Sequence, residues 1–290
     1  MAIDGPTTAI DLGGTKIAAA RVQGARILER RQVPTPRTGN FDDVLAAIAG
    51  LAGDWADGVV ALATTGLVDQ GRLTAINPKT LDVPFGLPIE ALLGARLGVP
   101  VRAMNDAQAA AWGEYRHGAG QGTGSMLFLT VSTGIGGGLV LDGRLRTGSG
   151  GLAGHVGHIL ADPAGPLCGC GRYGCLEAVA SGPALERAGA RRLGRALTCE
   201  DLFRAATTDA QAAAVLDDAA QSIASVLCSL HAALELDCAV IGGSVGLATG
   251  FLARIDTAMA QAPARLRLGI RAARLGADAG LVGVADLASS

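Results

Sequence analysis

The chain has 290 residues, of which 49% are hydrophobic and 17% charged, and its formal net charge is -2. This is the composition of an ordered globular protein, and a chain longer than roughly 250 residues is expected to form two lobes. Its 24 basic residues are scattered without long runs, which argues against nucleic acid as a partner. The apolar stretches are broken by Gly, Ser and Thr, and the first residues do not resemble a secretion signal. We therefore expect no membrane partner and a cytoplasmic location.

Taken in chain order, the first predicted elements are two strands joined by a glycine-rich turn. Residues 7–22 (TTAIDLGGTKIAAARV) consist of an apolar run, a turn and a second apolar run, which predicts a hairpin. Residues 41–55 carry apolar positions at helical spacing. Residues 101–118 predict a short strand and then an Ala-rich helix that begins near Asn105 and ends at Gly118.

The second half of the chain repeats part of this arrangement. Residues 125–145 again place a small-residue turn between two apolar runs, about 120 residues after the first hairpin. Residues 238–255 predict a buried strand that leads through Gly-Gly-Ser into a helix. Before it, a stripe of apolar residues predicts one long buried helix: Leu216, Ile223, Leu227, Leu230 and Leu234. Alternating strands and helices predict an α/β fold, and the repeat predicts two lobes of related topology.

Both glycine-rich turns have a composition that suits phosphate groups. In residues 11–16 (DLGGTK), two glycines let backbone N–H groups approach an anion, and Thr15 and Lys16 add a hydroxyl group and a positive charge. Asp11 precedes them, where phosphates and a divalent cation would meet. Residues 132–138 (STGIGGG) form a second such turn. A tight hairpin turn without a ligand is the alternative for each, but two such turns favour a polyphosphate.

Neither turn matches the Walker pattern or the dinucleotide-binding fingerprint. We therefore expect a nucleotide to be held by hairpins rather than by a helix N-terminus. The Gly-Gly-Ser at 242–244 is the exception, because it could place backbone amides near an adenosine.

Asn105 and Asp106 are the best candidates for chemistry. They follow a predicted strand at the start of a helix, and one of them is expected to cap that helix. Strand ends collect active-site residues in α/β folds, although Asp106 could equally be an ordinary carboxylate of a first helical turn. The helix N-terminus is expected to lower the pKa of Asp106 and weaken it as a base. A loose phosphoryl-transfer transition state tolerates a weak base.

One histidine and three cysteines predict a metal site. His158 precedes a glycine-rich loop that carries Cys168, Cys170 and Cys175. These residues would complete a tetrahedral shell, which is typical of structural Zn²⁺. The alternative is a loop with three buried thiols.

Four segments together resemble the ROK family of sugar kinases and repressors, within the actin and hexokinase superfamily: AIDLGGTK, LTVSTGIGGG, AMNDAQAAAWGE and GHVGHILADPAGPLCGCGRYGCLEAVASG. The similarity runs from about residue 8 to about residue 285. It implies a two-lobed, ribonuclease-H-like fold with an interlobe cleft for ATP, Mg²⁺ and a sugar, and it suggests a homodimer. The expected lobes are residues 1–117, with a helix at 278–290 packing back on them, and residues 118–277, which carry the zinc loop.

The resemblance also implies roles for individual residues. Asp106 would take the proton from the sugar 6-hydroxyl, and Asp11 would help to place Mg²⁺ through water. The implied sugar contacts are Asn105, His155, His158, Glu177, Gly66 and Asn77. The implied contacts to ATP are Asp11, Gly13, Gly14, Thr15, Lys16, Thr133, Gly134, Gly242 and Gly243.

The chain departs from the common family pattern at His155, where most members have Glu. The loss of that carboxylate changes the environment expected around carbon 2 of the sugar. Together with INP at 76–78, the HVGH motif looks most like the bacterial family members that act on N-acetylmannosamine. This likeness implies ATP-dependent phosphorylation of that sugar at its 6-hydroxyl, in sialic acid catabolism.

Three alternatives remain. A glucokinase or another hexose or hexosamine kinase of the family would have the same fold and base. A repressor would carry a DNA-binding segment before the first strand, where this sequence has about seven residues. A non-catalytic sugar sensor would not need Asp106 or the two phosphate turns.

Overall fold

The computed structural model describes residues 5–77, 81 and 83–289, and these form two compact units. The first unit comprises Met1–Gln121, Leu145–Ala153 and Ala277–Ser290, and the second comprises Gly122–Arg144 and Gly154–Gly276. The segment Leu145–Ala153 was expected in the second lobe. It belongs to the first unit because the Gln108 side chain donates hydrogen bonds to the carbonyls of Gly151 and Ala153.

The first unit is built on a five-stranded sheet in the order β3-β2-β1-β4-β7. β1 pairs antiparallel with β2 and parallel with β4, so the predicted first hairpin is confirmed. The strands are β1 (Thr7–Leu12), β2 (Lys16–Gln23), β3 (Arg26–Pro34), β4 (Val60–Thr64) and β7 (Val101–Asn105), with a separate pair β5 (Leu67–Asp69) and β6 (Arg72–Thr74). The helices are α1 (Phe41–Ala52), α2 (Ile89–Leu97), α3 (Asp106–His117) and α9 (Ala279–Ser289).

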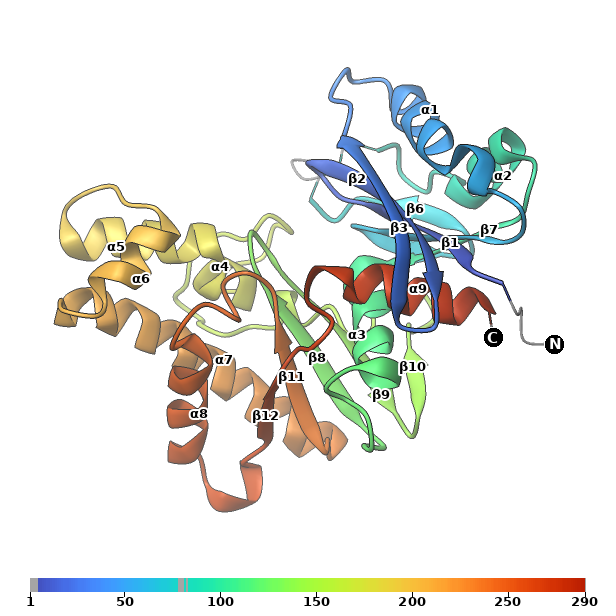
Figure 1. The fold of residues 1–290 in the computed structure, drawn as a ribbon. Coiled ribbons are helices and arrows are strands. Elements are labelled where there is room, and N and C mark those ends of the chain that lie inside the picture. The colour runs from blue at the N-terminus through green and yellow to red at the C-terminus, as the bar shows by residue number, and fades with distance from the viewer. Residues whose placement is uncertain (1–4, 78–80, 82, 290) are drawn as a thin grey trace. The chain divides into compact units, whose positions relative to one another are not determined.

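The two faces of this sheet carry side chains of different size. Ile10 and Leu62 belong to the large-residue core that packs against α1 and α2. Ala9 and Ala63 alternate with them along β1 and β4, which places them on the opposite face. On that face, α3 and α9 lie side by side (Figure 1). They approach so closely that a Cβ on Gly283 would lie 1.8 Å from the Ala109 carbonyl oxygen.

The second unit repeats the strand order of the first. Its sheet runs β10-β9-β8-β11-β12, with β8 antiparallel to β9 and parallel to β11. The repeat predicted from the two glycine-rich hairpins is therefore present in the topology. The strands are β8 (Met126–Val131), β9 (Ile135–Leu141), β10 (Arg144–Arg146), β11 (Cys238–Gly242) and β12 (Gly269–Ala272).

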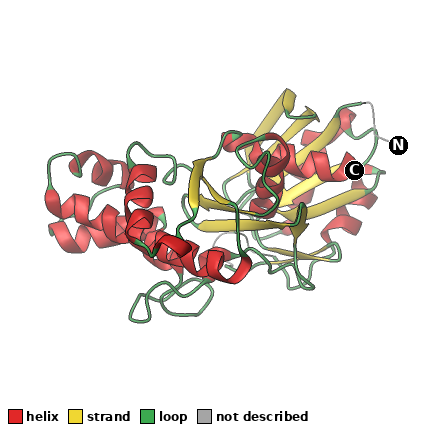
Figure 2. Ribbon diagram, turned by 90° about the horizontal axis from the view of Figure 1, so that it is seen from below, coloured by secondary structure: helices red, strands yellow, loops and turns green. Residues whose placement is uncertain are grey.

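The core of the second unit lies between its sheet and a group of helices (Figure 2). These are α4 (Leu176–Ala180), α5 (Gly182–Leu193), α6 (Cys199–Ala205), α7 (Ala210–Leu234) and α8 (Phe251–Gln261). α7 is the predicted long helix, and by length and composition alone it could cross a membrane. Its apolar stripe instead packs into the core, with Leu216, Ile223 and Leu227 buried, so we interpret it as a core helix.

The strand and the helix predicted in residues 238–255 are both present, with a turn between them. The helix after β11 begins at Phe251 and does not follow directly from the Gly-Gly-Ser. After Ser244 the chain instead turns back on the second hairpin, because the amides of Val245 and Gly246 both donate to the Val131 carbonyl. These glycines therefore lie beside β8 and not at a helix N-terminus.

Candidate functional site

The first glycine-rich turn joins β1 to β2 and is tightly closed. The Gly13 amide donates to the Lys16 carbonyl at 3.1 Å. This bond occupies the Gly13 N–H, and it leaves Gly14 and Thr15 at the apex between the strands. Thr15 and Lys16 are exposed, as a turn that meets a ligand from solvent requires.

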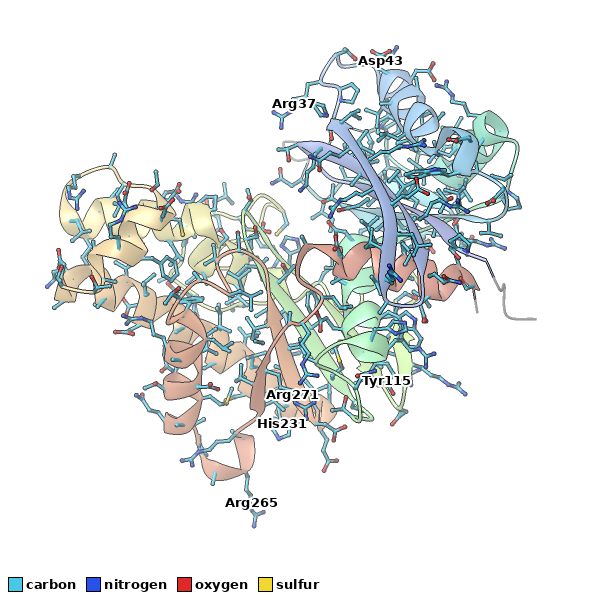
Figure 3. All side chains as sticks on the ribbon, in the orientation of Figure 1. Arg37, Asp43, Tyr115, His231, Arg265 and Arg271 are labelled. Atoms are coloured by element: carbon cyan, nitrogen blue, oxygen red, sulfur yellow. The ribbon has the colours of Figure 1, made fainter. Side chains whose placement is uncertain are left out.

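Two residues that the sequence analysis missed support this turn from the segment after β3. Thr35 donates its hydroxyl hydrogen to the Gly13 carbonyl at 2.7 Å. Arg37 donates to the Gly14 carbonyl at 3.1 Å, and its side chain is exposed beside the turn (Figure 3). Arg37 therefore adds a second positive charge to that of Lys16. The basic residue after Pro-Thr-Pro was the available signal, but its place in the fold was not readable from the sequence.

Asp11 lies near the end of β1 in a desolvated position. Burial, and then the nearby carboxylate of Asp106, raise the pKa of Asp11 to about 6, while Lys16 and Arg30 act in the opposite direction. Two acidic groups thus lie close together in the first unit at the carboxyl ends of parallel strands. A divalent cation held near them would favour their charged forms.

Asn105 ends β7 and caps α3. Its Oδ1 atom accepts hydrogen bonds from the amides of Ala107 and Gln108 at 3.0 and 3.1 Å, and its Nδ2 atom donates to the Gly66 carbonyl at 2.9 Å. The expectation that one residue of the pair caps the helix is confirmed. Both Oδ1 lone pairs are used, one Nδ2 hydrogen goes to Gly66, and the side chain also hydrogen-bonds to the carboxylate of Asp106. Gly66, a predicted sugar contact, thereby becomes part of the same arrangement.

Asp106 is half-buried, and its Oδ1 atom accepts a hydrogen bond from the Ala107 amide at 2.7 Å. Burial raises the pKa of Asp106, although its hydrogen bonds to Ala107 and Asn105 act in the lowering direction. The expected net lowering by the helix N-terminus is therefore wrong, because desolvation outweighs it. A carboxylate with a raised pKa is a stronger base than the sequence suggested.

Replacing Asp11 with Asn should stabilise the protein in a pH-dependent way. The folded state holds the Asp11 proton more tightly than the unfolded state, so wild type loses stability as the pH rises from 3.8 through about 6. The full loss corresponds to about 3 kcal/mol. Thermal unfolding should show Asp11→Asn more stable than wild type at pH 8 and nearly equal at pH 4. Asp57→Asn, an exposed site of the same unit, serves as the control. A difference that does not change with pH would contradict the assignment.

The second glycine-rich turn joins β8 to β9, with Thr133 exposed and Gly134 half-buried. The third glycine cluster lies against it. A Cβ on Gly243 would lie 2.2 Å from the Val131 carbonyl oxygen, and the Ser132 and Ser244 hydroxyl oxygens are 3.0 Å apart. Gly242 is buried under the Phe128 ring, where a Cβ would lie 3.1 Å from ring carbons. Gly242 therefore serves packing in this structure, whereas Gly243 belongs to the backbone beside the turn.

Glu177 connects the second turn to the cysteine loop. Its Oε2 atom accepts a hydrogen bond from the Ile135 amide at 3.0 Å, and its Oε1 atom lies 3.9 Å from the Cys168 sulfur. Glu177 is in the first turn of α4, where a carboxylate is common. Its partners, however, are the Ile135 amide and the Cys168 sulfur, so its side chain also links β9 to the cysteine loop.

In the HVGH motif, His155 directly precedes a short 3₁₀ turn, Val156–His158, and His158 is the last residue of that turn, in the second unit. This turn packs closely on β9, since a Cβ on Gly157 would lie 2.0 Å from the Ile135 carbonyl oxygen. His155 and His158 are both half-buried. Asn77 is half-buried in the first unit, while Pro78 of the INP motif lies outside the described residues.

The four predicted metal ligands come together. The donor atoms of His158, Cys168, Cys170 and Cys175 all lie within 4.8 Å of one another. The Cys170 and Cys175 sulfurs are 3.7 Å apart, as are the Cys168 sulfur and His158 Nδ1. Tetrahedral ligands about 2.3 Å from Zn²⁺ are separated by roughly 3.8 Å. The donor set and spacing therefore fit structural Zn²⁺. Nδ1 would face the metal, which leaves Nε2 of His158 for another partner.

The ROK family model matches residues 7–290. A protein of Salmonella typhimurium named N-acetylmannosamine kinase is 45% identical over 285 residues, which cover 97% of this chain and 98% of that protein. The ROK hexokinase from Thermus thermophilus is 38% identical, with a TM-score of 0.83 and 96% of each chain covered. A ROK family glucokinase from Streptomyces griseus, solved with glucose and AMPPNP, is 34% identical, with a TM-score of 0.82 and 98% and 99% of the two chains covered. These likenesses confirm the predicted hexokinase-like α/β fold.

Proposed function

The chain belongs to the ROK family, and from that premise we propose that it transfers the terminal phosphoryl group of ATP to the 6-hydroxyl of N-acetylmannosamine. The product is N-acetylmannosamine 6-phosphate, formed in the cytoplasm during sialic acid catabolism. The observation that carries the proposal is the pair Asn105 and Asp106, in which a helix-capping asparagine holds a base whose pKa is raised by desolvation, at the end of a strand. The similarity to N-acetylmannosamine kinases at 45% identity supports the choice of sugar.

Asp106 acts as the base in this proposal. As the sugar O6 atom bonds to the γ-phosphorus, the bond from that phosphorus to the β,γ-bridging oxygen breaks and ADP leaves. The O6 proton passes to Asp106. Its Oδ1 atom is held by the Ala107 amide, so Oδ2 is the atom that receives the proton. Asn105 holds the Asp106 carboxylate and contacts the sugar beside it.

The glycine-rich turns bind the nucleotide. Gly14, Thr15 and Lys16 of the first turn and Thr133 and Gly134 of the second contact the phosphates, with Gly13 closing the first turn. Gly243, beside the second turn, borders the adenosine. When bound, Mg²⁺ would neutralise charge on the phosphates, and Asp11 would place it through water. Arg37 adds positive charge beside the first turn.

The second unit supplies further sugar contacts. We assign sugar hydroxyl groups to Glu177 and to Nε2 of His158, and the acetamido group to the imidazole of His155. Asn77 and the backbone at Gly66 complete the set. A structural Zn²⁺ held by His158 and the three cysteines would fix the loop from which His158 and Glu177 project.

The expected assembly is a homodimer, which sedimentation equilibrium can test.

The substitution His155→Glu tests the assignment of specificity. A carboxylate at this position suits a hydroxyl group at carbon 2 and lacks a donor for the acetamido carbonyl oxygen. We expect kcat/KM for N-acetylmannosamine to fall about 10- to 100-fold, while that for glucose is unchanged or rises. Steady-state kinetics with both sugars measure the ratio, and His117→Gln, a half-buried site on α3, serves as the control. An unchanged ratio would remove His155 from sugar discrimination.

Glucokinase activity is the second candidate function, because the Streptomyces griseus relative was solved with glucose.

The position of the phosphate on the sugar separates transfer to the 6-hydroxyl from transfer to another hydroxyl group. In ³¹P NMR, the phosphomonoester signal of each anomer of the product should be coupled to the two protons at carbon 6. Coupling to a single proton would place the phosphate on another carbon and contradict the role of Asp106.

A further inference from the structure

Gln108 is a buried polar residue that the proposed reaction does not use. It lies on α3, two residues after Asp106, and its side chain is 2% exposed. Its Nε2 atom donates to the carbonyls of Gly151 and Ala153 at 3.1 and 2.8 Å. Both amide hydrogens therefore go to one short segment that is distant in the sequence. A buried side-chain amide that donates both of its hydrogens to backbone carbonyls holds that backbone segment in place, because breaking either bond would leave a buried polar group without a partner.

The segment it holds, Leu145–Ala153, is named the strap here. The Ala153 amide closes a loop within the strap by donating to the Thr147 carbonyl at 3.0 Å. On its other side the strap presses on β5, since a Cβ on Gly151 would lie 2.4 Å from the Val68 carbonyl oxygen. Gly151 also has a φ of +75°. The position therefore favours glycine both for lack of space and for its backbone conformation. Gln108 thus completes a strap that is packed on one side and hydrogen-bonded on the other.

The strap leads directly to a predicted sugar contact. Ala153 is the last strap residue, and the chain continues through Gly154 to His155. Gly154, with a φ of +85°, is packed so closely in the second unit that a Cβ would lie 2.8 Å from the Gly138 Cα atom. Ala153 is therefore held within the first unit, and Gly154 is packed within the second.

We propose that Gln108 is a positioning residue for the sugar: by holding the strap on α3, it orders the segment that leads along the chain to His155. The inference rests on the proposed function. It predicts an effect on sugar binding rather than on the chemical step. Asn105 and Asp106 are held by the backbone amides of Ala107 and Gln108, and these remain when the Gln108 side chain changes. A loosened strap must be ordered again whenever the sugar binds, which raises KM for the sugar.

Two substitutions test the proposal in the full chain. Gln108→Leu keeps the size of the side chain but donates no hydrogen bond. Gln108→Glu keeps its shape but cannot donate while ionised. For both at pH 8, we expect KM for N-acetylmannosamine to rise about tenfold or more, with kcat and KM for ATP within about threefold of wild type. The matched control is Gln121→Leu, which removes an exposed glutamine that also donates to a backbone carbonyl, that of Arg116.

The pH profile separates positioning from general damage. Burial raises the pKa of a carboxyl group, so the introduced Glu side chain should become protonated as the pH falls and recover one donated bond. The sugar KM of Gln108→Glu should therefore move toward the wild-type value at low pH, whereas that of Gln108→Leu should keep a constant ratio to wild type. A constant ratio for both variants, or an unchanged sugar KM for Gln108→Leu, would overturn the proposal. So would a fall in kcat without a change in KM.

Hydrogen exchange measured by mass spectrometry provides a readout that needs no activity. Amides of the strap should exchange faster in both variants than in wild type, and those of α1 should be unchanged. Unchanged exchange in the strap would contradict the claim that Gln108 holds it. If wild type phosphorylates no sugar, the proposed function fails, while the exchange experiment still decides whether Gln108 holds the strap.

Discussion

The substitution Asp106→Asn is expected to lower kcat about a thousandfold, while KM for the sugar stays within about threefold of the wild-type value. The Asn side chain retains an Oδ1 atom that can accept the Ala107 amide hydrogen, so the start of α3 should keep its structure. It cannot accept the O6 proton in the way a carboxylate does. Steady-state kinetics with saturating Mg²⁺ and ATP measure both parameters.

Asp43→Asn is the matched control for this substitution. Asp43 also lies in the first turn of a twelve-residue helix, α1, but its side chain is exposed (Figure 3). It should leave kcat unchanged. A near-normal kcat for Asp106→Asn would remove Asp106 from the mechanism, and a large rise in KM with normal kcat would instead make it a sugar ligand.

The substitution Cys170→Ser should have the second large effect. It removes one of four ligands whose donor atoms lie within 4.8 Å of one another. We expect bound zinc to fall from about one equivalent per chain to well below one, and the free energy of unfolding to fall on the order of several kcal/mol. Because Glu177 contacts the Cys168 side chain, KM for the sugar should rise about tenfold or more. Elemental analysis, thermal unfolding and kinetics measure the three effects.

Cys228→Ser is the control for the metal site, since Cys228 is half-buried on α7 and lies outside the cluster. It should retain the metal and the sugar KM. Full activity of Cys170→Ser in a preparation shown to be free of zinc would contradict the role of the metal. Prolonged dialysis of wild type against a chelator should reproduce the effect of the substitution, which tests the metal without changing the chain.

The elements that could be predicted from the sequence are those specified by local patterns. The first hairpin follows from two apolar runs around Gly13 and Gly14, and the strand-to-helix junction follows from the capping preference of Asn105. The metal cluster was predictable because the chemistry of thiol and imidazole ligands restricts their arrangement so strongly. In each case the residues that determine the structure are near one another in the chain.

The features that could not be predicted depend on residues far apart in the chain. The pKa of Asp106 is raised by desolvation, which the local sequence does not encode. The helix N-terminus, which the local sequence does predict, would have lowered that pKa. The strap was placed in the wrong lobe because the Gln108 contacts that hold it cross more than forty positions. Arg37 reaches the first turn from a segment after β3. These are tertiary effects that periodicity and capping rules do not report.

The measurement that tests the central claim most directly is ADP release by wild type with Mg²⁺ and ATP across four sugars: N-acetylmannosamine, N-acetylglucosamine, glucose and mannose. The account predicts the highest kcat/KM for N-acetylmannosamine. A preference for glucose would keep the fold and the base but contradict the assignment of His155 to the acetamido group. No turnover with any of the sugars would contradict the kinase itself and favour a non-catalytic sugar sensor.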